Sequence, residues 1–143
     1  MTDPQRVVID TSTLVGAVLR PASVPRQAFL AAVSAFELCV SSATLDELRR
    51  VLGRAKFDRY APRQQRLDFG ELVTQRSRLW EIDAISAQAA TGACRDAKDD
   101  KFLALALACE AATLVSSDDD LLVLHPWQGI QILTPAAFLR REN

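Results

Sequence analysis

The sequence has little of several features on which many enzymes and secreted proteins depend. It contains one histidine and three cysteines among 143 residues, and no two cysteines have C-x-x-C spacing. With a single histidine and no serine in a nucleophile-elbow context, a Ser-His-Asp triad is not expected. The odd number of cysteines argues against a disulfide framework and against a thiolate metal site. We therefore expect the cysteines to pack in the core and His125 to lie in a surface loop.

Net charge and hydrophobic runs are also limited. The net charge is −1, so no overall positive field indicates nucleic acid, although a local basic patch can bind it equally well. No apolar run approaches the length of a membrane span or resembles a signal peptide. A cytoplasmic protein without a membrane partner is therefore expected. Apolar residues at 49% and charged residues at 24% are typical of a folded chain, and residues 1–143 are predicted to form a single domain.

Short β-branched apolar runs alternate with segments of helical period. Strands are predicted at residues 6–10, 38–42, 113–117 and 130–134, with a weaker candidate at 79–82. Helices are predicted at residues 24–36, 44–52, 62–77, 99–112 and 135–140. This alternation predicts an α/β fold with three layers, α/β/α, around a central parallel sheet of about five strands.

Acidic side chains adjoin the apolar runs in four places. They are Asp10, Glu47, the group Asp96, Asp99 and Asp100, and the run at 118–120. Ligands of a parallel sheet bind at the carboxyl ends of its strands, and the topology brings all four segments to that rim. Mutual repulsion there would raise the pKa values of the acids unless a cation neutralises them. Carboxylate oxygens without His or Cys suit Mg²⁺ or Mn²⁺.

Each acidic segment also has a purely structural interpretation. Asp99 or Asp100 could only cap a helix, and Glu47 could only complement a helix dipole. Residues 118–120 could form an ordinary polar turn. For each of these three segments taken singly the simpler explanation is preferable. Asp10 differs, because a carboxylate at the end of an apolar first strand, followed by three hydroxyl residues, more often belongs to a site. The convergence of all four segments on one rim favours a functional site.

A basic stretch follows the second acidic segment. Residues 49–66 contain seven Lys or Arg against one acid, a local charge of +6, with Phe57 and Tyr60 interleaved. Such a stripe could hold a phosphate backbone while an aromatic ring stacks on an unpaired base. The alternative is a solvated helical hairpin, and for Phe57 and Tyr60 individually we expect the rings to face the core.

Four motifs together resemble those of a known family. VVIDTSTLVGAVL, SSATLDELRRVL, DAKDDKFLALALA and LVSSDDDLLVL resemble, in order, the motifs of the PIN-domain ribonuclease family, in particular the compact VapC-like toxin components of bacterial toxin–antitoxin pairs. The resemblance implies a Mg²⁺- or Mn²⁺-dependent endoribonuclease with an RNA substrate. It also implies a cognate antitoxin and a homodimer, for which apolar surface on the first helices could supply the contacts.

The resemblance also implies roles for individual residues. The acids that would bind metal and support catalysis are Asp10, Glu47, Asp100 and Asp118, with Asp99 as the close alternative to Asp100 and Asp120 as a possible auxiliary ligand. The hydroxyls that would orient water or ligands are those of Thr11, Ser12 and Ser117. The cations that would contact RNA phosphates are Arg49, Arg50 and Arg54.

Two departures from the family pattern concern serines. Ser12 stands where the family usually has Asn, and Ser116 and Ser117 stand where Gly or Thr commonly precedes the last acid. A hydroxyl can still hold a water or the Asp10 carboxylate, and all four acidic positions are filled. The competing hypothesis is a non-catalytic RNA- or antitoxin-binding module that keeps the acids for folding.

Overall fold

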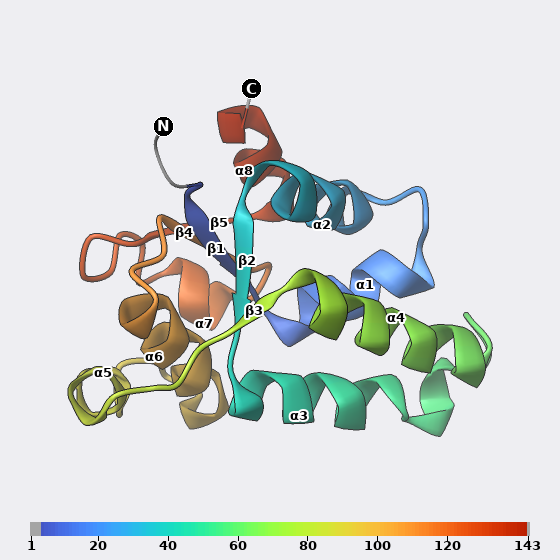
Figure 1. Ribbon diagram of the computed structural model, residues 1–143, viewed down its shortest axis with the longest axis horizontal. Helices are drawn as coiled ribbons and strands as arrows, with labels where there is room; N and C mark the ends of the chain where they lie inside the picture. Colours follow the sequence, from blue (N-terminus) through green and yellow to red (C-terminus); the bar gives the residue numbers. More distant parts are fainter. Residues whose placement is uncertain (1–3, 143) are drawn as a thin grey trace.

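The computed structural model describes residues 4–142 and has a five-stranded sheet at its centre (Figure 1). The strands are β1 (Arg6–Ile9), β2 (Glu37–Val40), β3 (Arg78–Leu79), β4 (Thr113–Val115) and β5 (Gln131–Leu133). Their order is β3-β2-β1-β4-β5, and every neighbouring pair is parallel. This confirms the predicted α/β fold. The predicted single domain includes residues 1–3 and 143, which lie outside the described residues, and it stays a prediction.

Helices connect these strands along the chain. They are α1 (Thr11–Leu19), α2 (Val24–Ala35), α3 (Ser42–Leu52), α4 (Arg63–Arg76), α5 (Ala84–Ala90), α6 (Asp100–Ala108), α7 (Asp119–Leu122) and α8 (Pro135–Glu142), with short 3₁₀ turns η1 (Ala55–Phe57) and η2 (Ala97–Asp99). Five correspond to predicted helices, whereas α1, α5 and α7 were not predicted. Helix α6 ends at Ala108 rather than at residue 112, because Glu110 adopts a left-handed φ of 54°.

Helix α1 escaped prediction because it has no polar face. Its sequence, TSTLVGAVL, is buried on nearly every side, so the helical period that marks an amphipathic helix is missing. The helix begins where the Asp10 carboxylate accepts a hydrogen bond from the backbone N–H of Thr13 at 3.0 Å. The same aspartate that ends the first strand therefore also starts α1.

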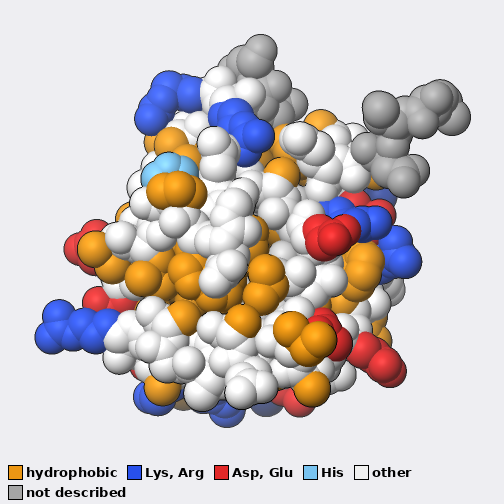
Figure 2. Space-filling view, turned by 90° about the vertical axis from the view of Figure 1, so that its left-hand side faces the viewer, with side chains coloured by type: hydrophobic (Ala, Val, Ile, Leu, Met, Phe, Trp, Pro, Cys, Tyr) orange, Lys and Arg blue, Asp and Glu red, His pale blue; other side chains and the backbone are white. Residues whose placement is uncertain are grey.

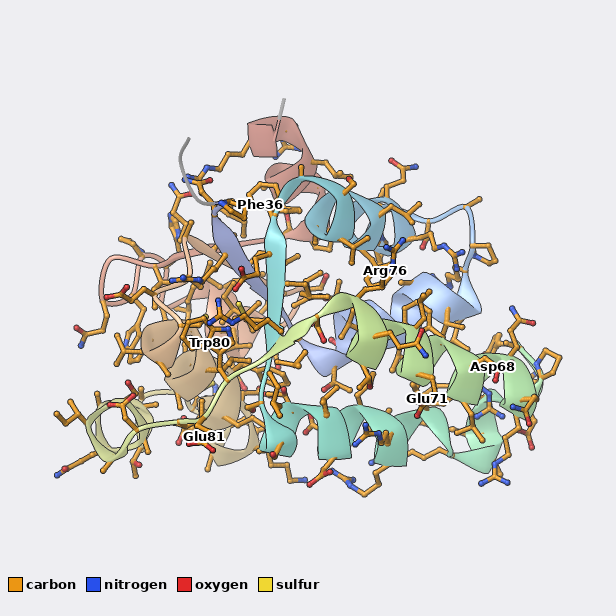
Figure 3. All side chains as sticks on the ribbon, in the orientation of Figure 1. Phe36, Asp68, Glu71, Arg76, Trp80 and Glu81 are labelled. Carbon is orange, nitrogen blue, oxygen red and sulfur yellow. The ribbon has the colours of Figure 1, made fainter. Side chains whose placement is uncertain are left out.

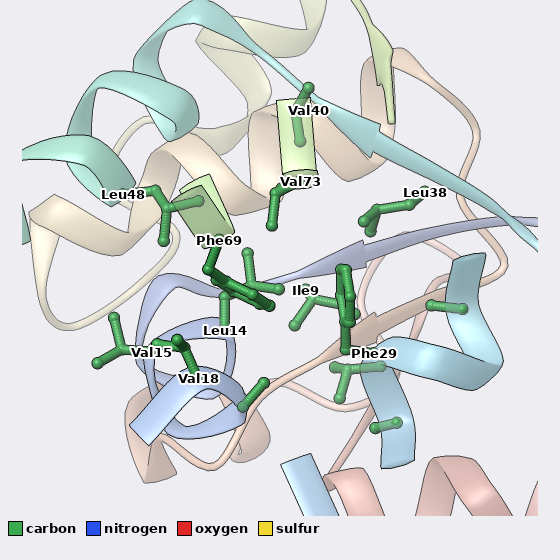
Figure 4. Close-up of a cluster of buried hydrophobic side chains, with 14 of the residues drawn as sticks. Ile9, Leu14, Val15, Val18, Phe29, Leu38, Val40, Leu48, Phe69 and Val73 are labelled. Atoms are coloured by element: carbon green, nitrogen blue, oxygen red, sulfur yellow. The ribbon is translucent and has the colours of Figure 1, made fainter. Parts of the chain in front are cut away.

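Side chains of β1, β2, β4 and β5 alternate between two apolar clusters, one on each face of the sheet. Ile9 of β1 and Leu38 of β2 face the cluster that includes α1, α2, α3, α4 and α8 (Figure 4). At its centre the rings of Phe29 and Phe69 lie 5.1 Å apart. These helices occupy one side of the sheet in Figure 1, with α5, α6 and α7 on the other side.

The second cluster holds all three cysteines, which are buried as predicted. Trp80 follows β3 and packs against this cluster (Figure 3), with the guanidinium groups of Arg6 and Arg78 over its ring at 4.8 and 4.5 Å. The outer surface on this side has hydrophobic side chains gathered in its middle (Figure 2). Within the described residues, none of the helices has the length and apolar character that a bilayer crossing demands.

The strand order determines where a ligand can bind. β1 lies between β2 and β4, so the chain leaves the carboxyl end of β1 toward one edge of the sheet and that of β4 toward the other. A crevice forms at such a switch point, outside the carboxyl ends of the strands. Asp10 and Asp118 follow β1 and β4 at this position.

Candidate functional site

A cavity of about 690 Å³ lies at this switch point. Its acidic lining residues are Asp10, Glu47, Asp99 and Asp118, and its basic lining residues are Arg20, Arg50, Arg54, Lys56, Lys98 and Lys101. The structure therefore brings one residue from each of the four acidic segments to one rim. The cavity, called the cleft below, has an acidic end at the strand termini and a basic end formed by α3 and η1.

Asp10 is the most enclosed of these acids, with 4% of its surface exposed. Its Oδ1 accepts hydrogen bonds from the Thr13 amide at 3.0 Å and the Ser12 hydroxyl at 3.4 Å. Its Oδ2 accepts a hydrogen bond from the Ser116 hydroxyl at 2.5 Å. Burial raises the pKa of Asp10, and the hydrogen bonds from Ser116 and Thr13 only partly offset this; the charge of Asp118 raises it further.

Ser116 connects the first and last acidic segments. Besides donating to Asp10, its Oγ accepts a hydrogen bond from the backbone N–H of Asp118 at 2.9 Å. Ser116 is fully buried, whereas Ser117 is exposed and lies outside the described lining of the cleft. The supporting hydroxyl of this segment is thus Ser116 instead of the predicted Ser117. The signal that could have identified it is its position, because Ser116 directly follows the fully buried strand β4.

Asp99 occupies the N-cap position of α6, yet its side chain makes no capping hydrogen bond within the described chain. Its Oδ2 is buried without a hydrogen-bond partner among residues 4–142. Burial first, and then the neighbouring Asp118 carboxyl, raise the pKa of Asp99 to about 7. Burial is thus the largest single cause of the raised pKa, and the neighbouring carboxyl groups add to it. Capping does not explain this aspartate.

Asp100 was preferred to Asp99 from the sequence, and the structure places it elsewhere. Its Oδ2 accepts a hydrogen bond from the Gly92 amide at 2.9 Å, and its Oδ1 accepts one from the Cys94 amide at 3.0 Å. These bonds hold the turn after α5, and Asp100 lies outside the described lining of the cleft. Asp120 also lies outside that lining. Of the two adjacent aspartates, Asp99 is the one that the structure places in the cleft lining.

Glu47 reaches the cleft from α3 and is already bonded at both carboxylate oxygens. The Lys101 ammonium donates to its Oε1 at 2.7 Å, and the Thr11 hydroxyl donates to its Oε2. The predicted supporting residue Thr11 therefore acts on Glu47, whereas Ser12 acts on Asp10. Lys101 was not identified from the sequence, although its position directly after the third acidic segment was a visible signal.

The acidic end of the cleft offers carboxylate and hydroxyl oxygens as donors for a divalent cation. Within residues 4–142, no three Asp, Glu, His or Cys side chains form a ready-made ligand set. The available donors are nevertheless all oxygens, as Mg²⁺ and Mn²⁺ prefer. The buried, unpartnered Oδ2 of Asp99 and the raised pKa values of Asp10 and Asp99 are features that added positive charge would relieve. The acidic end therefore fits a hard cation.

Only some of the predicted phosphate-binding cations face the cleft. Arg50 and Arg54 line it together with Lys56, and all three are exposed. Arg49 instead points toward α4, where its Nη2 donates to the Thr74 hydroxyl at 3.4 Å, and it lies outside the described lining. The structure thus brings two of the three predicted arginines to the site.

Arg66 is part of the basic stretch but is completely buried. Its guanidinium donates to the carbonyl oxygens of Leu52 (2.5 Å), Arg54 (2.9 Å) and Ala61 (3.1 Å), and it forms an ion pair with Asp58. These bonds close the loop that follows α3 and carries the basic lining residues. Arg66 is therefore a structural cation in a region that the sequence presents as a uniform basic stripe.

The two aromatic residues of the stretch differ from each other. Phe57 is half-buried, packs against the apolar cluster of α1–α4 and also lines the cleft. Tyr60 is 59% exposed, with the Arg59 guanidinium 5.5 Å from its ring centre. The prediction that both rings face the core is wrong for Tyr60. Phe57 is the aromatic residue that combines core packing with a face on the cleft.

Comparison with known families agrees with this geometry. The family model of the PIN domain matches residues 6–120, a span that includes all four acidic positions of the cleft. The chain belongs to the PIN domain family. A search of curated proteins gives no significant sequence match.

Solved structures show the same fold at low sequence identity. VapBC2 from Rickettsia felis, bound to a DNA fragment from its promoter, matches with a TM-score of 0.63 and 14% identity over 89% of this chain and 96% of that one. PAE2754 from Pyrobaculum aerophilum matches with a TM-score of 0.63 and 14% identity, over 95% of this chain and 88% of that one. Mycobacterium tuberculosis VapC20, a sarcin-ricin loop cleaving toxin, matches with a TM-score of 0.56 and 11% identity, over 87% of this chain and 98% of that one.

Proposed function

We propose that this chain is a Mg²⁺- or Mn²⁺-dependent endoribonuclease that hydrolyses RNA phosphodiester bonds. The observation that carries the proposal is the cleft, in which the buried Asp10 and the partly buried Asp99, both with raised pKa values, share the lining with six Lys and Arg side chains. The acids suit a divalent ion, and the cations suit a polyanionic substrate. Membership of the PIN family supports the same assignment.

Asp10, Asp99 and Asp118 would hold the ion, with Glu47 at the edge of the site. A divalent ion bound there would supply Lewis acidity and an activated water for attack on phosphorus. Ser116 holds the Asp10 carboxylate and the Asp118 backbone in fixed positions. Such support would hold the two residues in place when an ion binds.

Arg50, Arg54 and Lys56 would bind the RNA backbone beside the reacting phosphate. They are exposed, they line the same cleft as the acids, and they come from the end of α3 and from the loop closed by Arg66. Phe57 adds an aromatic surface to the cleft lining. Unpaired bases stack on such surfaces, so this arrangement favours single-stranded RNA.

The biological role that we propose is that of the toxin component of a toxin–antitoxin pair, acting in the cytoplasm. The Rickettsia felis neighbour was solved as VapBC2, and the Mycobacterium tuberculosis neighbour is a toxin that cleaves the sarcin-ricin loop. A cognate antitoxin and a homodimer are part of the proposal.

The apolar surface that would form the homodimer is on α2, where Val24 is 41% exposed and Leu30 is 49% exposed. Light scattering gives the mass of the unaltered chain and of Leu30→Lys in solution, and the homodimer predicts a lower mass for the variant.

A second candidate is a non-catalytic module that keeps the acids for folding. The observation in its favour is that Glu47 already has an ammonium and a hydroxyl as partners within the protein. In such a module a metal ion would stabilise the fold without cleavage of RNA.

Titration with Mn²⁺ separates the two candidates when melting temperature and cleavage of a fluorescent RNA are followed together. A nuclease gains thermal stability and cleaves RNA over the same range of Mn²⁺ concentration, and a chelator abolishes both effects. Asp10→Asn removes one charge from the acidic end and should abolish both responses without loss of the fold. An Asp10→Asn protein with normal Mn²⁺-dependent cleavage would refute the assignment, and stabilisation without cleavage of any RNA would favour the module.

A further inference from the structure

Glu47 differs from the other acids of the cleft because its charge is already neutralised within the protein. Lys101 of α6 donates to its Oε1 at 2.7 Å, and Thr11 of α1 donates to its Oε2. By contrast, Asp99 has a buried oxygen without a partner among the described residues. The cleft thus contains one acid with an internal counter-ion next to acids that lack one.

The ion pair between Lys101 and Glu47 is well enclosed. The two side chains are only 24% and 14% exposed. The Lys101 ammonium also donates to the carbonyl oxygen of Lys98 at 2.7 Å and lies 5.6 Å from the centre of the Phe102 ring. Limited exposure reduces screening by water, so this pair interacts more strongly than one on the open surface.

We propose that Lys101 competes with the divalent metal ion for Glu47, so that the ion binds only as the ammonium leaves the carboxylate. Lys101, Glu47 and the three aspartates line the same cleft, so a dication among the aspartates repels the ammonium and attracts Glu47. The flexible four-carbon stem of lysine allows the ammonium to move away. This inference rests on the proposed metal-dependent function and names a residue that regulates its metal affinity.

Calorimetric titration with Mn²⁺ alone tests the competition. Lys101→Met should lower the dissociation constant for Mn²⁺ by about three- to tenfold, the effect expected from one partly screened unit charge. Lys98→Met is the matched control, because Lys98 is an exposed cation of the same cleft and takes part in none of the ion pairs found in residues 4–142. An unchanged or weaker affinity of Lys101→Met, or an equal gain in Lys98→Met, overturns the proposal.

A double-variant comparison and a measurement on the unaltered chain complete the test. In a Glu47→Gln background, Lys101→Met should tighten Mn²⁺ binding less than it does in the unaltered chain, because only the through-space repulsion by the ammonium is relieved once the contested carboxylate is absent. In the unaltered chain, Mg²⁺ should raise the reactivity of Lys101 toward an amine-reactive ester several-fold relative to Lys98, as read by mass spectrometry. Constant Lys101 reactivity overturns the proposal even where the methionine variant fails to fold.

The outcomes also separate this inference from the proposed function. If the unaltered chain binds Mn²⁺ and cleaves RNA while Lys101→Met binds Mn²⁺ equally well, only the competition is wrong. If neither protein binds Mn²⁺, the metal-dependent function and the competition are both wrong.

Discussion

At the acidic end of the cleft the charges are on Asp and Glu side chains that follow β1 and β4 or lie on α3 and at the start of α6. At the basic end they are on the longer side chains of α3 and of the segment around η1. Asp10 is 4% exposed and has hydrogen-bond donors on both oxygens. Arg50, Arg54 and Lys56 are exposed. Each substitution at the acidic end should therefore act sharply on catalysis, and each at the basic end should act gradually on RNA affinity.

Lys101 stands where the two ends meet. Its ammonium is the only cation of residues 4–142 that is paired with an acid of the cleft lining. Asp10 and Asp118 accept hydrogen bonds from hydroxyl and amide groups, whereas the buried Oδ2 of Asp99 has no partner among residues 4–142. Within the acidic end, Glu47 is therefore balanced by a cation, whereas the aspartates are not paired with any cation of residues 4–142.

The largest effect, on the rate of RNA cleavage, is expected from substituting Asp99 and not its neighbour Asp100. Asp99→Asn should lower the Mn²⁺-dependent cleavage rate by about a thousandfold, because it removes a charge from the ion's surroundings. Asp100→Asn should keep cleavage within about threefold and lower the free energy of unfolding by about 1 kcal/mol, since only hydrogen bonds to the Gly92 and Cys94 amides are weakened. Cleavage assays and urea unfolding of both variants measure these effects, and the opposite ranking would restore Asp100 as the functional acid.

A second prediction concerns Arg66, the residue of the basic stretch that is buried and hydrogen-bonded as Asp10 is. Arg66→Ala should lower the free energy of unfolding by about 3 kcal/mol, because three backbone carbonyl groups lose a charged donor. Arg63→Ala, an exposed change at the start of α4, should stay within about 0.5 kcal/mol. Urea denaturation measures both. Equal stabilities would mean that the basic stretch is uniform after all.

The arrangement of the acids could be predicted from the sequence because it follows from topology. Parallel strands place their carboxyl ends on one edge, so the positions after β1 and β4 were expected to meet there. The choice between Asp99 and Asp100 could not be derived in this way. Both residues start the same helix, and only the hydrogen bonds of Asp100 to the turn after α5 show which carboxylate is already occupied.

The distribution of the cations was harder to predict than that of the acids. Local charge identified the stretch at 49–66, but it did not distinguish the buried Arg66 from the exposed Arg50. Such differences depend on side-chain directions at the ends of α3 and α4, which sequence spacing alone does not fix. Helix α1 was missed for a related reason, since a helix buried on nearly every side lacks a polar face.

A third, smaller effect is expected on the pH dependence of stability. Burial, as the largest single cause, and the neighbouring carboxyl groups raise the pKa of Asp99 from 3.8 to about 7. The folded state therefore binds more protons than the unfolded state between these values, and its stability falls as pH rises through them. With a chelator present, the free energy of unfolding should be lower at pH 8 than at pH 5, and Asp99→Asn should reduce this difference by about 1 kcal/mol, a value that allows for solvent screening. Identical pH profiles would show that Asp99 is not perturbed.

The smallest effects are expected at the basic end, where neighbouring arginines of α3 provide an internal comparison. Arg50 lines the cleft, whereas Arg49 points to Thr74 on α4. In an Asp10→Asn background, which keeps RNA uncut, Arg50→Ala and Arg54→Ala should each weaken single-stranded RNA binding about threefold and reduce the slope of log affinity against log salt by about 0.7. Arg49→Ala should change neither quantity, because its charge lies away from the path of the phosphates. Fluorescence anisotropy over a salt series measures both. If Arg49→Ala matched Arg50→Ala, RNA would have to cross the outer face of α3 and α4, and the basic end of the cleft would lose its proposed role.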